Sequence, residues 1–249
     1  MSNYNNFSPF YDVLTYDVDY KKRTEYILSL FERFDKKPTL MLDLACGTGN
    51  FSVQFSKRDI DVIGVDPSEG MLCEAQAKNR LLEKPVLYLC QKGEELDLFG
   101  TVDGAVCCLD SLNHITDFEN LKKTIQKVSL FLEKDKLFIF DLNTPYKHKN
   151  VLANNSFHIH KKGIDCFWSN SLMGDNVTVE VTLNITYKTG LFKKDTVTEQ
   201  FCERAYTHKE IAEALEFAGL KLEAVYCENT FDSPKETAQR NIYVTRKIN

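Results

Sequence analysis

Met41-Leu-Asp-Leu-Ala-Cys-Gly-Thr-Gly-Asn-Phe51 decides the fold of this chain, together with Val62-Ile-Gly-Val-Asp66 shortly after it. The first apolar run reaches Leu44 and breaks into Gly47-Thr48-Gly49, and the second ends in Asp66. Glycines at a strand-to-helix turn let the backbone approach a ligand. An acid at the end of the second strand can accept both hydroxyls of a ribose, although it can also serve only as a helix cap. The stretch predicts half of a nucleotide-binding α/β unit.

Strands and helices alternate on either side of this stretch. Apolar periodicity predicts helices at residues 20–34, 50–57, 68–82 and 117–131, and strands at residues 39–45, 61–66, 85–90, 102–109 and 137–142. Further signals predict a helix at residues 208–218, capped by Thr207 and stopped by Gly219, and strands at 221–227 and 241–246. This order predicts a doubly wound, mostly parallel sheet of seven strands.

The pattern changes after the fifth strand. Apolar and polar side chains alternate over residues 177–187, which is typical of an antiparallel strand with one wet face. Lys188-Thr189-Gly190 predicts a turn, and residues 196–206 return. If Tyr187 pairs near Leu191, Val197 and Phe201 continue the apolar face.

The same register places Arg204 and Tyr206 on the opposite face. We expect residues 150–206 to form a small antiparallel β insertion that covers the substrate as a lid. Residues 1–149 and 207–249 then form the cofactor-binding domain, with a helical cap at the N-terminus.

Bulk composition narrows the class of protein. The 249 residues are 43% hydrophobic and 27% charged, with a net charge of −5 and no basic block, so a nucleic-acid partner is not expected. No apolar run approaches the roughly 20 residues that span a bilayer, and the N-terminus lacks a signal-peptide pattern. We expect a cytoplasmic protein with no membrane partner. The eight scattered cysteines form no C-x-x-C pair, which favours reduced, buried thiols over metal ligands or disulfides.

Two residues around the glycines indicate the kind of nucleotide. Asp43 lies four residues before Gly47, where a carboxylate suits a cationic ligand and would repel a pyrophosphate. Ser52 occupies the third position of the dinucleotide pattern G-x-G-x-x-G, where glycine or alanine is usual. Both residues argue against a dinucleotide.

Several motifs carry a family resemblance. Asp43-Leu-Ala-Cys-Gly-Thr-Gly-Asn50 and Val62-Ile-Gly-Val-Asp-Pro-Ser-Glu-Gly-Met-Leu72 resemble the cofactor-binding half of class I S-adenosylmethionine-dependent methyltransferases, which have a Rossmann-like fold. Cys107-Cys-Leu-Asp-Ser-Leu-Asn-His-Ile115 and Phe138-Ile-Phe-Asp-Leu-Asn-Thr-Pro-Tyr146 resemble motifs of small-molecule members. The N-terminal segments Tyr11-Asp12 and Asp17-Val-Asp-Tyr20 resemble those of a bacterial subgroup of these enzymes.

The resemblance implies cofactor-binding roles at matching positions. It implies that the loop Ala45, Cys46, Gly47, Thr48 and Gly49 wraps the methionine part of S-adenosyl-L-methionine. Asp43 would lie near the amino group, Asp66 would hold the ribose, Pro67 and Met71 would flank the adenosine, Leu109 would approach through its carbonyl, and Tyr11 and Tyr20 would close over the cofactor.

The adenine side departs from the family pattern. Many relatives carry an acid after the third strand that binds the adenine amino group, whereas this chain reads Cys90-Gln-Lys-Gly-Glu94. A lysine cannot accept that hydrogen bond. Gln91, Lys92 and Gly93 are the expected adenine-side residues, with Gln91, Glu94 or the backbone replacing the missing acceptor.

Candidate catalytic residues follow the fourth strand, where open α/β sheets place ligands. Asp110, Asn113 and His114 lie there, and Asp110 or His114 can orient a nucleophile or remove its proton. Asp110 can equally cap a turn, and His114 can be a hydrogen-bonded structural histidine.

The insertion supplies the candidate substrate ligands Arg204, Tyr206 and Trp168, and Arg240 is a weaker candidate. A guanidinium that faces the cleft would clamp a carboxylate, although strand arginines are often solvated or ion-paired.

The predicted function is methyl transfer to an N or O atom of a small molecule by direct displacement, which needs alignment and exclusion of water but no metal. One alternative is an NAD(P)-dependent oxidoreductase, which shares the glycine turn and the ribose acid but is disfavoured by Asp43 and Ser52. Another is a non-catalytic binding module of the same fold. The sequence does not indicate the oligomeric state.

Overall fold

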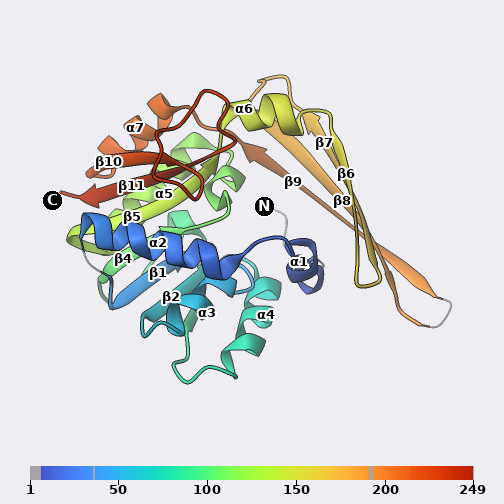
Figure 1. The fold of residues 1–249 in the computed structure, drawn as a ribbon, viewed down its shortest axis with the longest axis horizontal. Helices are drawn as coiled ribbons and strands as arrows, with labels where there is room; N and C mark the ends of the chain where they lie inside the picture. The colour runs from blue at the N-terminus through green and yellow to red at the C-terminus, as the bar shows by residue number, and fades with distance from the viewer. Residues whose placement is uncertain (1–6, 36, 191–192, 249) are drawn as a thin grey trace.

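The computed structural model describes residues 7–35, 37–190 and 193–248 and contains a seven-stranded and a four-stranded sheet. The larger sheet has the order β10-β11-β5-β4-β1-β2-β3 (Figure 1). Its strands are β1 (Leu40–Leu44), β2 (Asp61–Asp66), β3 (Leu87–Cys90), β4 (Val102–Cys107), β5 (Leu132–Asn143), β10 (Leu220–Cys227) and β11 (Arg240–Lys247). Only β11 runs opposite to the other six strands of this sheet, so the predicted doubly wound, mostly parallel fold is confirmed.

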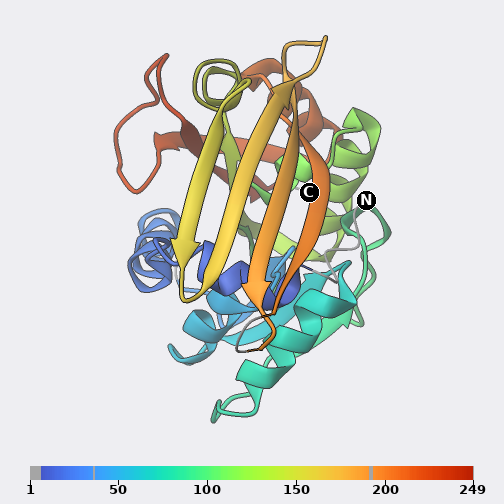
Figure 2. The same ribbon diagram turned by 90° about the vertical axis from the view of Figure 1, so that its right-hand side faces the viewer.

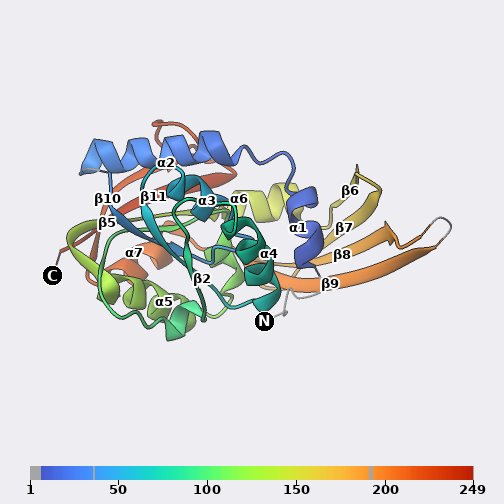
Figure 3. The same cartoon turned by 90° about the horizontal axis from the view of Figure 1, so that it is seen from below.

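Helices cover both faces of the larger sheet, with α2 on one side and α5 and α7 on the other (Figure 3). The α-helices are α1 (Ser8–Leu14), α2 (Tyr20–Phe34), α3 (Asn50–Ser56), α4 (Glu69–Asn79), α5 (Phe118–Phe131), α6 (Pro145–Lys147) and α7 (His208–Phe217). Short helical turns are η1 (Gly93–Glu95), η2 (Ser111–His114) and η3 (His148–Leu152). None of the helices in the described part of the chain is long and apolar enough to cross a membrane.

The side-chain period of β1 explains the two layers. Met41 packs into the core beneath α2 and α3, whereas Leu42 and Leu44 pack into the core beneath α5 and α7. Alternate residues of a strand point to opposite faces, so Asp43 faces the same side as Met41, towards α3.

Helix ends follow the expected capping chemistry. Asp19 and Ser68 accept backbone hydrogen bonds at the starts of α2 and α4, and Thr207 with Glu210 forms a capping box at the start of α7. Gly219 follows α7 with a φ of +69°, as the predicted stop requires. The predicted helix boundaries are therefore close to the observed ones.

The insertion forms the separate four-stranded antiparallel sheet. It contains β6 (Ser156–Lys161), β7 (Ile164–Leu172), β8 (Thr178–Lys188) and β9 (Lys194–Arg204), in that spatial order. The sheet extends from the main body next to α1 and presents one broad face outwards (Figures 1 and 2).

The register between β8 and β9 differs from the prediction, but the assignment of faces is correct. Tyr187 pairs with Asp195, and not near Leu191, which lies outside the described residues. Val197 pairs with Ile185 and Phe201 with Val181, so both continue the apolar face, and Arg204 pairs with Thr178 on the other face. The register moved by an even number of residues, and such a shift keeps every side chain on its face.

The cysteines are less uniformly buried than expected. All eight carry free thiols, but only Cys107, Cys108 and Cys166 are buried, whereas Cys73 and Cys90 are exposed.

Candidate active site

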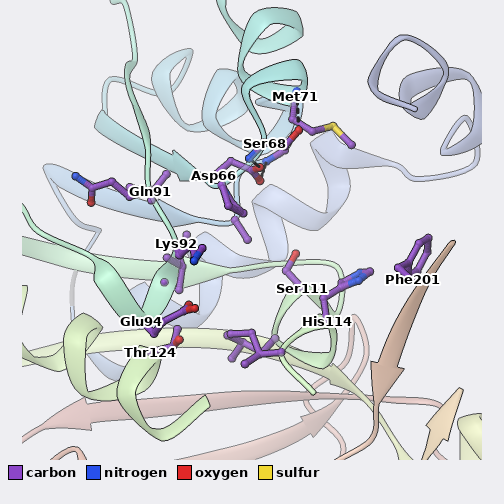
Figure 4. A pocket seen from close by; sticks show the side chains of 18 of the residues that line it. Asp66, Ser68, Met71, Gln91, Lys92, Glu94, Ser111, His114, Thr124 and Phe201 are labelled. Carbon is purple, nitrogen blue, oxygen red and sulfur yellow. Dashed lines mark hydrogen bonds between the residues drawn. The ribbon is translucent and has the colours of Figure 1, made fainter. Parts of the chain in front are cut away.

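A cavity of about 710 Å³ lies at the carboxyl ends of β1, β2 and β4 and reaches the inserted sheet. Asp66, Ser68 and Met71 lie on one side, Lys92, Glu94 and Thr124 lie at one end, and Ser111, His114 and Phe201 lie at the other (Figure 4). Clefts at this edge of an open α/β sheet are the usual ligand sites of the fold. The predicted cofactor residues Tyr11, Ala45, Gly47, Asp66, Pro67, Met71, Gln91, Lys92, Gly93 and Leu109 contribute to its lining.

The glycine loop adopts the conformation that its sequence requires. Ala45, Gly47 and Gly49 all have positive φ angles, of +54°, +54° and +74°. A Cβ at Gly49 would lie 2.3 Å from the hydroxyl of Tyr88, so both the backbone angle and the space demand glycine there. A Cβ at Gly47 would meet no atom within 4 Å because that position borders the open cavity.

Asp66 holds this loop and also faces the cavity. Its carboxylate accepts hydrogen bonds from the backbone N–H groups of Gly47 and Ser68, both at 2.9 Å. Burial raises its pKa, and these two N–H donors partly offset the effect. The carboxylate of Asp66 is therefore fixed by backbone N–H groups of the glycine loop and of the turn before α4, and its contact with ribose hydroxyls stays a prediction.

Asp43 lies behind the loop and does not contribute to the cavity lining. It is 1% exposed and accepts a 2.5 Å hydrogen bond from Ser52 Oγ of α3. Burial raises its pKa to about 7, with a further contribution from the charge of Asp66. Ser52 thus replaces the glycine of the dinucleotide pattern with a donor to Asp43. The predicted contact of Asp43 with an amino group, direct or through water, stays a prediction.

Helix α1 is tied to the glycine loop from outside. Asp12 accepts hydrogen bonds from Thr48 Oγ1 at 2.6 Å and Asn50 Nδ2 at 2.8 Å, and it forms a 2.6 Å ion pair with Lys78 of α4. Lys78 also donates to the carbonyl of Thr48. We name this group the α1 clasp. It places Tyr11, the neighbour of Asp12, in the cavity wall.

Tyr20, Cys46, Thr48 and Gly49 belong to the support of the cavity and not to its lining. Tyr20 packs edge-on against Phe51 at 5.1 Å and donates to Thr15 Oγ1 at 3.1 Å. Tyr20 was predicted to close over the cofactor, whereas in this structure α2 holds its ring against α3.

At the end of the cavity beyond β3, the side chain of Gln91 already has hydrogen-bond partners within the protein. Its side-chain amide donates to the carbonyl of Asp97 and accepts from the Asp97 N–H, which fixes the loop. Lys92 forms a 3.4 Å ion pair with Glu95. The carboxylate of Glu94 and the hydroxyl of Thr124 border the same end (Figure 4). The acceptor missing at Lys92 is therefore best replaced by Glu94 or by backbone.

The chain turns sharply after β4, and a buried arginine fixes the turn. Leu109 and Asp110 have φ angles of +55° and +52°, and both donate their N–H groups to the carboxylate of Asp141. Arg240 is 9% exposed and forms ion pairs with Asp110 at 2.5 Å, Asp141 at 2.7 Å and Glu228 at 3.1 Å. Although burial opposes ionisation, Arg240 lowers the pKa of Asp110 to about 2.

Two of the three catalytic candidates are structural in this arrangement. Asp110 lies outside the cavity lining, pairs with Arg240 and accepts from Asn143 Nδ2 at 2.7 Å. Asn113 is fully buried, donates to the carbonyls of Asn143 and Arg204, and accepts from the Asn143 N–H. It therefore joins η2, β5 and β9.

His114 is the catalytic candidate that reaches the cavity. Its ring lies 5.0 Å from that of Phe201 on β9, and its Nε2 lies 3.7 Å from Oε1 of Glu203. Gln200 and Cys202 line the cavity beside Phe201. The insertion therefore contributes to the cavity through residues that the sequence did not single out.

The predicted substrate ligands of the insertion lie elsewhere. Arg204 pairs with Glu210 at 2.7 Å and stacks over Tyr206, and the Tyr206 hydroxyl donates to the carbonyl of Ile115. Trp168 packs against Phe157 and donates to Asn170 Oδ1. None of the three lines the cavity, and neither does Arg240. Arg204 faces α7 and is paired there with Glu210, so the carboxylate clamp stays a prediction.

Comparison with known proteins identifies the family. A family profile described as "Methyltransferase domain" matches residues 41–135. A crystal structure of an S-adenosylmethionine-dependent methyltransferase from Clostridium acetobutylicum ATCC 824 is 31% identical, with 99% of each chain covered and a TM-score of 0.89.

The chain belongs to the class I S-adenosylmethionine-dependent methyltransferases.

More distant similarities agree with this family. YqeM of Bacillus subtilis (strain 168), which is named a candidate methyltransferase, is 27% identical over 98% of this chain and 97% of its own. The sugar N-methyltransferase KedS8 of Streptoalloteichus shares the fold, with 17% identity, 96% and 93% coverage and a TM-score of 0.80. The methyltransferase therefore uses S-adenosyl-L-methionine, and the cavity suits it, because Asp66 and the backbone of Gly47 border a space large enough for a nucleoside.

The sequence carries a signal for two acidic residues of β9 that were not among the predicted site residues. Glu199 and Glu203 occupy positions two and six residues after Val197, so the alternation places both acids on the apolar face. A buried acid at such a position is unusual and marks a special role. The α1 clasp had no such signal, because Asp12, Thr48 and Lys78 come from three separate segments.

Proposed function

We propose that this methyltransferase transfers the methyl group to an N or O atom of a small molecule bound between η2 and β9. The observation that carries the proposal is that one cavity joins the glycine loop and Asp66 to His114 and Phe201. Cofactor and acceptor can therefore meet without crossing protein.

The cofactor half contributes binding and orientation. S-adenosyl-L-methionine supplies an electrophilic methyl group on a sulfonium, and direct displacement requires the acceptor atom to lie in line with it. Asp66 and the backbone of Gly47 would hold the nucleoside and methionine parts. Tyr11 and the α1 clasp would exclude water from that side.

The acceptor half contributes a base and apolar walls. His114 lines the acceptor half of the cavity, and an imidazole can act as a general base towards an N–H or O–H. Leu112, Ile115 and Phe201 also line this part of the cavity. A flat or partly apolar acceptor would suit these walls. The fold shared with a sugar N-methyltransferase supports a small acceptor.

The first experiment tests turnover. The purified protein is incubated with S-adenosyl-L-methionine and a panel of amines, phenols and carboxylic acids, and S-adenosylhomocysteine is quantified. We expect at least one acceptor class to exceed the acceptor-free background. Calorimetric binding of NAD without binding of S-adenosyl-L-methionine would support the oxidoreductase alternative, and cofactor binding without turnover would support the binding module.

Two variants separate the halves of the cavity. Asp66→Asn should weaken cofactor binding by about 10-fold or more in calorimetry, because it loses the charged acceptor of the loop. His114→Asn should reduce kcat by roughly 100-fold with an unchanged cofactor Kd. His160→Asn, on an exposed side chain of β6, is the control for the histidine change. Equal activity of His114→Asn and the wild type would exclude His114 as the base.

A further inference from the structure

Glu203 of β9 is a buried acid between two histidines. It is 7% exposed, and its oxygens lie 3.7 Å from His114 Nε2 and 3.9 Å from His148 Nε2. These separations are ion-pair contacts that exceed hydrogen-bond length. Burial raises the pKa of Glu203, and the charge of His114 opposes that rise. An acid in this position needs a partner, because a desolvated carboxylate is costly when unpaired.

His148 supplies a second, independent observation. The ring is fully buried, and its Nδ1 lies 2.8 Å from the carbonyl of Val177, so Nδ1 carries a proton. Its Nε2 has no hydrogen-bond partner within the described residues. Burial lowers the pKa of His148, and its Nε2 faces Glu203. Glu203 therefore lies between His148, which is buried, and His114, which lines the cavity.

Further charged groups surround Glu203. Asp110, Lys147 and Arg240 also act on Glu203. Arg240 is already paired with Asp110, Asp141 and Glu228. Lys147 donates to Asn143 Oδ1, and burial lowers its pKa. Among the described residues, the ion-pair contacts of Glu203 are with the two imidazoles.

We propose that Glu203 is the positioning residue for His114, with the buried His148 on its other side. The carboxylate orients the imidazole in the cavity and stabilises the imidazolium that forms on proton uptake. This inference deepens the proposed function and rests on it for the role of His114. Through Glu203, the insertion contributes a functional residue to the acceptor site in addition to covering it.

The proton balance is simple. As the new bond from the methyl carbon to the acceptor N or O forms, the carbon–sulfur bond breaks and its electron pair stays on sulfur. The acceptor's proton passes to His114, and the negative charge of Glu203 offsets the positive charge of the imidazolium. After product leaves, the proton returns to solvent through the open cavity.

The test measures the titration of histidine directly. The chain has five histidines, so ¹³C-edited NMR gives few ring signals, and His114→Asn assigns one of them. We expect the His114 ring signals to titrate at lower pH in Glu203→Gln than in the wild type, because an anionic neighbour is replaced by a neutral one of equal size. In His148→Asn, whose amide can still donate to the Val177 carbonyl, the His114 signal should also shift.

Glu199→Gln is the matched control. Glu199 lies on the same strand and the same face, is 8% exposed, and shares no ion pair with a histidine among the described residues. The control should leave the His114 titration unchanged. Thermal melting and calorimetric binding of S-adenosyl-L-methionine show that each variant is folded. Glu203→Asp, which restores the charge, should recover part of the shift.

Kinetics add a second readout with any acceptor found in the panel. Glu203→Gln should lower kcat about 10-fold and move the acidic limb of the kcat/KM profile to lower pH, with little change in the cofactor Kd. An identical His114 titration in the wild type and in folded Glu203→Gln would overturn the pairing. If no acceptor is methylated, the proposed function fails while the NMR result still judges the pairing.

Discussion

Asp43 shows how a single buried group makes stability depend on pH. Its pKa in the folded protein is about 7, against an ordinary value of 3.8, because α3 and the strand remove it from water. Between these two pH values the unfolded chain releases the proton while the folded chain keeps it. The folded state therefore binds more protons, and its stability falls as pH rises through this window.

We expect Asp43→Asn to flatten this dependence, because the amide can still accept from Ser52 Oγ but cannot ionise. Each pKa unit corresponds to about 1.4 kcal/mol. From pH 5 to pH 8 the wild type should therefore lose about 2–3 kcal/mol more unfolding free energy than the variant. Urea unfolding without cofactor measures both, with the exposed Asp61→Asn as control. A parallel loss in wild type and variant would contradict the account.

At the scale of elements, helix α1 depends on polar contacts with neighbouring segments, because it is too short to be stable alone. It has 7 residues, and isolated helices of that length are unstable. The α1 clasp fixes one side of it, and the ring of Phe10 packs on Tyr187 of β8 at 4.7 Å. The helix thus contacts both the cofactor loop and the inserted sheet.

Asp12→Ala should weaken this attachment and raise the Kd for S-adenosyl-L-methionine about five-fold, which corresponds to roughly 1 kcal/mol for a partly exposed charged network. Faster stopped-flow release of the cofactor should account for most of the change, because Tyr11 beside the clasp lines the cavity. Asp17→Ala, on an exposed residue just after the same helix, is the control. An unchanged release rate in Asp12→Ala would show that α1 does not hold the cofactor.

The elements themselves were largely predictable, because their signals are local. Gly47-Thr48-Gly49, Asp66 and the caps Asp19 and Ser68 act within a few residues of their own positions. The register between β8 and β9 was not predictable. The alternation of apolar and polar residues indicates the face of a side chain but not its partner on the neighbouring strand. The acceptor side was not predictable either, because contacts such as Glu203 with His114 join distant segments.

At the scale of the whole molecule, Asn113 joins the two sheets. It bonds the backbone of Asn143, where β5 ends, and the carbonyl of Arg204, where β9 ends. Asn113→Ala should reduce the unfolding free energy by about 3 kcal/mol, because buried backbone groups lose their partners. Asn184→Ala, on the outer face of β8, should change it by less than about 0.5 kcal/mol. Equal melting of both variants would show that this joint is not required.

The position of Asn113 between the two sheets also bears on how related proteins can diverge. The inserted sheet leaves and re-enters the main sheet at one point, since both crossings touch the same side chain. A segment whose two ends lie together can be lengthened, replaced or lost without displacing its host. Descendants of one ancestor could therefore keep the cofactor half and exchange the segment between Asn143 and Arg204, so new acceptors would arise by substitution of one piece of chain.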